Sequence, residues 1–145
     1  MTSDVTIALV GCVKAKLDCA APAQDLYTSP LFLGRRRWVE ARGYRWFVIS
    51  AEHGLVAPEA VLAPYDYTLK GRPVAVKRAW AARVLAQLDI ALGNVDGMSF
   101  EVHAGHAYLG FGLVDGLISR GAHVHNPVEG LGLGKQLQLY ARSKR

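Results

Sequence analysis

The sequence of 145 residues lacks the features of a membrane or secreted protein. It has no apolar run of the roughly 18 residues that a membrane-spanning helix needs. Its first residues, Met1 to Asp4, include no basic residue of the kind that opens a signal peptide, and the apolar run that follows is only Val5 to Val10. Its two cysteines, Cys12 and Cys19, are too few for a disulfide scaffold and are expected to be reduced thiols. We therefore expect a cytoplasmic protein that does not enter a membrane.

Acidic residues are the minority among the charged ones. The chain has 12 Asp and Glu against 17 Lys and Arg, a formal charge of +5. This balance suits a nucleotide, a nucleic acid or another phosphate-bearing partner. With 51% hydrophobic residues and no low-complexity segment, the chain is not disordered. We expect one domain over residues 1–145, with Ala141–Arg145 as a frayed, solvated tail.

Apolar β-branched runs alternate along the chain with segments of helical periodicity. The expected strands are Val5–Val10, Tyr44–Ser50, Ser99–His103 and Ala122–His125, and the expected helices are Pro30–Ala41, Val74–Leu92, His106–Arg120 and Leu131–Ala141. This alternation predicts an α/β fold: a single three-layer domain with a mostly parallel sheet of about four or more strands and helices on both faces.

One long segment, Ala51–Pro73, follows neither period and is expected to be irregular. Segments of this length in a compact domain are usually functional. Its prolines, which include Pro58 and Pro64, restrict the backbone and reduce the entropy lost on ordering. We therefore expect an ordered functional loop that forms a wall of the site.

Small residues and titratable side chains follow each expected strand. The segments are Gly11–Lys16, Ser50–Gly54, His103–Tyr108 and His125–Gly130. In open parallel sheets, ligands bind outside the carboxyl ends of the strands. The sequence therefore predicts one cleft there, lined by residues from all four segments and from the Ala51–Pro73 loop.

Several residues at this edge have two interpretations each. Lys14 and Lys16 belong either to a solvated turn or to a phosphate-binding loop, which is not a Walker loop because the Gly-Lys-Ser/Thr ending is missing. Cys12 is either a buried, inert thiol or a nucleophile. Gly105, before an expected helix, favours an anion site at the helix start. The basic run 35–37 is either a solvated helix face or a phosphate contact.

The histidines do not form a metal-binding motif. His103 and His106 are three residues apart, but no Cys-x-x-Cys or His-Glu-x-x-His accompanies them. We therefore expect no metal and no cofactor, and interpret these two histidines as hydrogen-bonding groups. His123 is expected at the surface.

The acids of the loops are the candidate catalytic groups, although any one of them taken alone is more simply explained as a solvated carboxylate. We expect Glu52 to face the substrate and Asp66, between two tyrosines, to orient a neighbour. The candidate catalytic residues are Glu52, His53, Asp66 and Glu129. The candidate phosphate- or substrate-binding residues are Cys12, Lys14, Lys16, Tyr27, Ser29, Ser50, Gly54, Tyr65, Thr68, His103, Gly105, His106 and Tyr108.

Two runs in the middle of the chain carry a resemblance. Residues 50–58 read SAEHGLVAP and residues 64–69 read PYDYTL; GCVKAKL at 11–17, DLYTSPLF at 25–32, HAG at 103–105 with Tyr108, PVEGL at 127–131 and GKQL at 134–137 accompany them. Together they resemble a family of small bacterial and phage proteins of unknown function, distantly similar to the peroxide-stress protein YaaA. The resemblance covers almost the whole chain and implies an α/β domain with a basic cleft. YaaA is longer and carries a helix-hairpin-helix-like DNA-binding element that has no counterpart here, so the resemblance does not extend to DNA binding.

The leading hypothesis is a nucleotide- or nucleic-acid-directed enzyme that cleaves an N-glycosidic bond. The lysines and the Gly105 turn would bind phosphate, and Tyr27, Tyr65 or Tyr108 would stack on a base. A loop carboxylate would stabilise the oxocarbenium-like transition state, and His53 would protonate the departing base. The alternative is a non-enzymatic, YaaA-like nucleic-acid-binding protein of stress response or phage–host conflict. A third hypothesis is a hydrolase with Cys12 as its nucleophile.

Overall fold

The structure is a computed structural model that describes residues 5–142. Its strands are β1 (Thr6–Gly11), β2 (Ala21–Pro22), β3 (Arg45–Ser50), β4 (Gly54–Val56), β5 (Val61–Leu62), β6 (Ser99–His103) and β7 (His123–His125). Its helices are α1 (Ala23–Leu26), α2 (Pro30–Ala41), α3 (Val74–Leu92), α4 (His106–Leu109), α5 (Leu113–Ser119) and α6 (Leu133–Arg142).

The main sheet has five strands in the order β4-β3-β1-β6-β7. Strand β1 lies in the centre and pairs in parallel with β3 and β6, and β7 adds in parallel to β6. Only β4 is antiparallel, because it turns straight back from β3. The remaining strands, β2 and β5, form a separate antiparallel pair. The predicted α/β fold with a mostly parallel sheet is confirmed.

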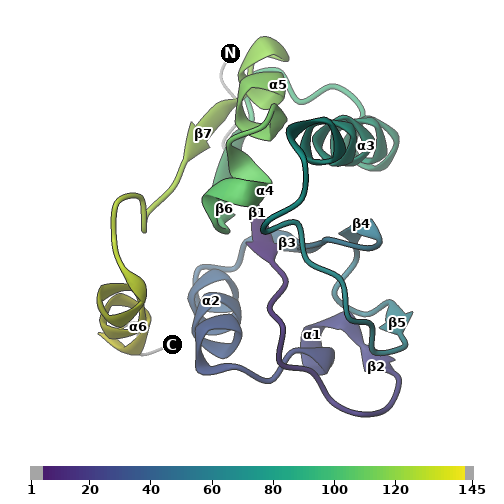
Figure 1. Ribbon diagram of the computed structural model, residues 1–145. Helices are drawn as coiled ribbons and strands as arrows, with labels where there is room; N and C mark the ends of the chain where they lie inside the picture. The colour runs from purple at the N-terminus through teal and green to yellow at the C-terminus, as the bar shows by residue number, and fades with distance from the viewer. Residues whose placement is uncertain (1–4, 143–145) are drawn as a thin grey trace.

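The sheet lies between two layers of helices, as predicted. Side chains of β1 alternate between the faces: Ile7 and Leu9 pack with α3 and α5, whereas Ala8 and Val10 pack with α1 and α2. Figure 1 shows these layers, with α6 lying beside α2. Both faces of β1 are apolar because both are covered, as is typical of parallel strands.

The order of winding reverses at β1. The chain passes from β1 to β3 on one side through α2, and then returns through α3 to β6 on the other side of β1. The connections of adjacent strands therefore diverge between β1 and β6, which leaves a crevice at their carboxyl ends. This is the position at which doubly wound sheets bind ligands.

Two expectations about the elements are wrong. The single helix expected over His106–Arg120 is two short helices, because Gly112 has a φ of 121° that interrupts helical geometry. The Ala51–Pro73 segment is not irregular throughout, since it contains β4 and β5. The final helix begins at Leu133, two residues later than expected, and includes the first two residues of the expected tail. Met1–Asp4 and the rest of that tail lie outside the described residues.

Within residues 5–142, no helix is both long enough and apolar enough to cross a membrane.

Candidate functional site

A cavity of about 630 Å³ opens at the carboxyl ends of β1 and β6. Its walls come from three segments: the turn after β1, the Asp66–Lys70 stretch of the long loop, and the start of α4. Its volume falls in the range of small-molecule sites, roughly 300–1,000 Å³. The candidate residues that line it are Cys12, Lys14, Lys16, Asp66, Thr68, Gly105, His106 and Tyr108. The structure thus brings together eight residues that the sequence singled out.

The cavity is basic. Lys14, Lys16 and Lys70 line it, against one carboxylate, Asp66. The ammonium nitrogen of Lys16 donates to the carbonyl of Lys14 at 3.1 Å and lies 4.3 Å from the centre of the Tyr65 ring. Burial lowers the pKa of Lys16, while nearby Asp66 partly opposes this. Lys16 is therefore a cation fixed by its contacts with Lys14 and Tyr65, and its remaining N–H donors are available to an anion.

Cys12 and Tyr108 meet at the inner wall of the cavity. The sulfur of Cys12 accepts the N–H of Ala51 at 3.4 Å and lies 3.5 Å from the Tyr108 hydroxyl. Thr68 contacts the same hydroxyl, and the Tyr108 ring packs edge-on against Trp80 with centroids 5.2 Å apart. Burial raises the pKa of Tyr108. In the part of the chain that the structure describes, the hydrogen-bond partners of the Cys12 sulfur are Ala51 and Tyr108 and include no histidine, so the hydrolase hypothesis gains no general base.

A hydrogen-bonded cluster anchors the loop that carries Asp66. Ser50 donates to the Tyr65 hydroxyl at 2.7 Å, and that hydroxyl also shares a hydrogen bond with Tyr27. Ser50 in turn accepts the backbone N–H of His53 at 3.1 Å. Tyr27 is only 1% exposed and burial raises its pKa to about 12, so it does not present a face for base stacking. Ser50, Tyr27 and Tyr65 thus position the neighbouring loop.

Asp66, rather than Glu52 as expected, faces the cavity. Asp66 is exposed and faces the cavity beside the lysines. Glu52 lines a separate shallow hollow with Trp80 and Arg83. The reason is the antiparallel strand β4. The tight turn from β3 into β4 places Glu52 next to α3, where Arg83 donates to the Glu52 carbonyl at 2.9 Å and fixes the turn.

The prediction of a single cleft is therefore wrong. His53 lies on the same turn as Glu52, with its ring 5.3 Å from that of Tyr65, and does not line the cavity. Glu129 lines a different cavity of about 510 Å³ between α5 and the segment before α6. Gly54 takes a φ of 72° in the turn before β4 and is buried there.

His103 is also away from the cavity, on the opposite face of the sheet. Its Nδ1 lies 2.7 Å from the Tyr140 hydroxyl and its Nε2 lies 2.8 Å from Glu101, which Trp38 also contacts. A neutral imidazole with its proton on Nε2 donates to Glu101 and accepts from Tyr140, so every partner is satisfied. The cause of this placement is the alternation of β6, which turns Val102 toward α3 and His103 toward α2.

Burial and hydrogen bonds together set the protonation of this cluster. It lowers the pKa of His103 and raises that of Tyr140 to about 12. Burial alone would raise the pKa of Glu101, but hydrogen bonds from His103 and Trp38 bring it below its usual range. His103, which was expected to bind substrate, is fully buried in this network and does not line the cavity.

Ser29 and the basic run 35–37, which were considered for phosphate or substrate binding, have partners within the protein. Ser29 caps α2 by accepting the N–H of Phe32 at 3.2 Å. Arg35 is buried and donates to the Gly11 carbonyl, and Arg36 pairs with Asp25 at 2.9 Å. Helix α4 has only four residues and is shorter than expected, and Gly105 before it lines the cavity.

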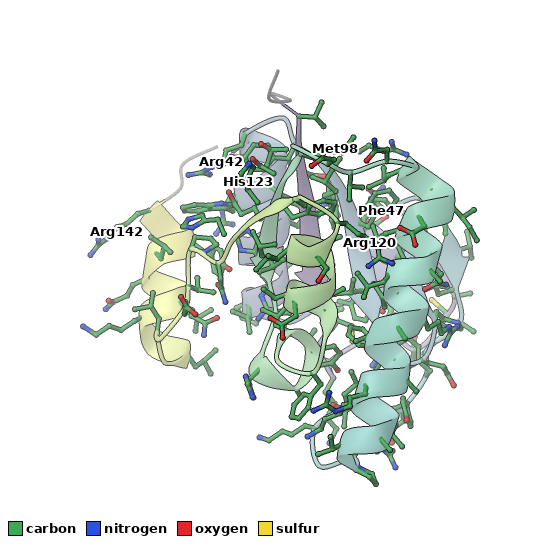
Figure 2. The ribbon with its side chains drawn as sticks, turned by 90° about the horizontal axis from the view of Figure 1, so that it is seen from above. Arg42, Phe47, Met98, Arg120, His123 and Arg142 are labelled. Atoms are coloured by element: carbon green, nitrogen blue, oxygen red, sulfur yellow. The ribbon has the colours of Figure 1, made fainter. Side chains whose placement is uncertain are left out.

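Sequence reasoning missed Tyr67 and Lys70, which line the cavity with the predicted residues. Both stand in or directly after the PYDYTL run, and that run was the available signal. Arg42, Met98 and His123, labelled in Figure 2, lie at the opposite, amino ends of the strands. His123 is exposed there, as expected. Among the described residues, no three or more His, Cys, Asp or Glu side chains form a group that could hold a metal ion.

Fold and cavity together define a doubly wound α/β protein with a basic site where its winding reverses. The chain belongs to DUF6884, a family of unknown function, which it matches over residues 7–142. Comparisons with curated proteins and with solved structures found no match.

Proposed function

We propose that the chain is a nucleotide-directed enzyme that hydrolyses an N-glycosidic bond in the cavity between β1 and β6. The observation that carries this proposal is the coincidence of a basic, partly aromatic cavity with the point where the winding of the sheet reverses. Lys14 and Lys16 supply the positive charge for a phosphate. Tyr67 and Tyr108 supply aromatic walls for a base.

Asp66 is the carboxylate for the chemical step, because it faces this cavity and Glu52 does not. Water attacks the anomeric carbon and gives up a proton to the solvent, the bond between that carbon and the base nitrogen breaks, and the base takes a proton as it leaves. The carboxylate of Asp66 stabilises the positive charge that develops on the sugar ring. His106 lines the same cavity and replaces His53 as the proton donor to the base.

One observation favours a second candidate, a nucleic-acid-binding protein without turnover. Among the described residues that line the cavity, Asp66 is the only carboxylate, whereas glycoside hydrolysis ordinarily uses two. This second candidate predicts binding that weakens steeply with salt and no release of base.

A panel of nucleoside monophosphates and short oligonucleotides separates the two candidates. Binding is measured by thermal shift, and release of free base is measured by chromatography. Asp66→Asn is expected to lower the rate of base release on the order of a thousandfold and to leave binding in place. Glu52→Gln is the matched control, since it alters an exposed carboxylate outside the cavity and should keep full activity.

Base release that persists in Asp66→Asn would remove Asp66 from the mechanism. Binding without base release by the unmodified chain would establish the second candidate. Absence of binding to every nucleotide and oligonucleotide tested would overturn both.

A further inference from the structure

We infer that the substrate of the proposed site is a nucleotide within a single-stranded polynucleotide rather than a free nucleotide. This inference rests on the proposed function. It is carried by the surface around the cavity, which extends the basic, aromatic character of the site well beyond the space that one nucleotide fills.

The cavity continues past the lysines into a second hollow of about 430 Å³. Both spaces share Lys14, Lys16 and Asp66, and the second adds Leu17, Pro64 and Tyr65. The lysines therefore stand between two adjoining spaces, where a phosphate that links two nucleotides would lie. A free mononucleotide would leave the second hollow unfilled.

Two more cations lie near the cavity, each over an aromatic ring. The guanidinium of Arg72 lies 4.4 Å from the ring of Tyr67, and its Nε donates to the Thr68 carbonyl at 3.1 Å. The ammonium of Lys77 lies 4.6 Å from the ring of Phe111, which packs against His106 with centroids 5.4 Å apart. Tyr67 and His106 both line the cavity, so Arg72 is one ring away from it and Lys77 is linked to it through Phe111 and His106.

These cations have no carboxylate partners within residues 5–142. Elsewhere, Arg36 pairs with Asp25 and Glu40, and Arg120, labelled in Figure 2 beside α3, pairs with Asp89. No such pair involves Lys14, Arg72 or Lys77. Unpaired basic residues interleaved with aromatic rings are the pattern with which proteins bind single strands, because phosphates meet the cations and bases stack on the rings.

Charge also limits the path that a bound single strand can take over the surface. The cavity on the other side of His106 carries Asp115 and Glu129, which would repel phosphates. The path that remains runs from the hollow at Tyr65, across the cavity, to Arg72 and Lys77. A duplex would not expose its bases to this path. In a single strand, one base can enter the cavity while the neighbouring nucleotides contact the cations and aromatic rings around it.

The test compares a nucleoside monophosphate with an oligonucleotide of about six residues, as single-stranded DNA, single-stranded RNA and duplex DNA. The single strands are expected to bind at least tenfold more tightly than the mononucleotide at about 50 mM salt. The double variant Arg72→Ala/Lys77→Ala should weaken single-strand binding about tenfold and leave mononucleotide binding unchanged. It should also reduce the slope of log K against log salt by about 1.4, for two phosphate contacts.

Lys135→Ala is the matched control, since it removes an exposed cation from α6 in the other layer and should change neither affinity. Which single strand binds more tightly distinguishes DNA from RNA. Equal affinity for mononucleotide and single strand, or tighter binding of the duplex, would overturn this inference while the proposed function stands. No binding to any of these ligands would remove the proposed function itself.

Discussion

Where β6 ends, the polar side chains on the two faces of the sheet differ in burial and in hydrogen bonding. On the α2 side, Glu101, His103 and Tyr140 are buried and bond to one another. On the α3 side, Lys14 and Asp66 are exposed to a cavity and keep their hydrogen-bonding capacity free. Groups that satisfy each other in the interior contribute to stability, whereas groups left facing a cavity are available to a ligand. The contrast predicts that substitutions on the two faces separate stability from binding.

The largest expected effect is on the buried face. His103→Ala removes the group that links Glu101 to Tyr140 and leaves a buried carboxylate short of a partner, so the free energy of unfolding should fall by about 3 kcal/mol. Urea denaturation measures this loss, and nucleotide binding by the folded variant should be unchanged.

His106→Ala is the control for that comparison. Its exposed ring lines the cavity, so stability should change by less than about 0.5 kcal/mol while nucleotide binding weakens. If His103→Ala were as stable as the unmodified chain, or if His106→Ala lost more stability, the assignment of the two faces would be reversed.

The second effect concerns the contact between α2 and α6. A Cβ at Gly34 would lie 2.7 Å from the Cβ of Tyr140, so Gly34→Ala must push the helices apart. Overpacking outweighs the gain in helix propensity, for a net loss of about 1.5 kcal/mol of stability. Gly134→Ala in α6 meets nothing within 4 Å and should be neutral or slightly stabilising. Equal stability of the two variants would show that α6 adjusts freely.

The fold followed from the sequence because its strands are continuous apolar runs between glycines, which only a covered parallel sheet explains. The same reasoning placed Lys14, Lys16 and Tyr108 at the cavity, since each follows β1 or β6 directly. It misplaced Glu52 and His53, because residues after β3 gave no sign that the chain turns back as an antiparallel strand.

His103 was misplaced for a different reason. The alternation of Glu101, Val102 and His103 shows that the two polar residues share a face, but a strand covered on both sides gives no indication of which face meets the cavity. The break at Gly112 was equally hidden, since a glycine inside a helical pattern is often tolerated. Tertiary pairing, not local pattern, decides each of these positions.

A smaller effect is expected where the two regions meet, at the anchor of the Asp66 loop. Tyr65→Phe removes the hydroxyl that joins Ser50 to Tyr27, and stability should fall by about 1 kcal/mol. Because the anchored loop carries Asp66, nucleotide turnover should fall as well. Tyr67→Phe is the control: Tyr67 contributes its ring to the cavity and no hydrogen bond of its hydroxyl to the described residues, so stability should be unchanged. Full stability and full turnover in Tyr65→Phe would show that the anchor is not needed.

The smallest effect is the pH dependence of stability that His103 contributes. In the folded chain burial lowers the pKa of His103 and keeps the ring neutral, whereas in the unfolded chain the ring takes up a proton near pH 6.5. The unfolded state therefore binds more protons as the pH falls below about 6.5, and stability declines from its full value above that pH. Glu101 adds a further loss at lower pH, because its pKa is also lowered in the folded chain and its contribution disappears once the carboxylate is protonated. Urea midpoints measured between about pH 7.5 and about pH 5.5 should fall for the unmodified chain and fall less steeply for His103→Gln.

The alternative is an ion pair between a protonated His103 and Glu101, which are 2.8 Å apart. In that case acid would raise the stability of the unmodified chain relative to His103→Gln, so the sign of the difference decides whether desolvation or charge pairing controls this side of the sheet.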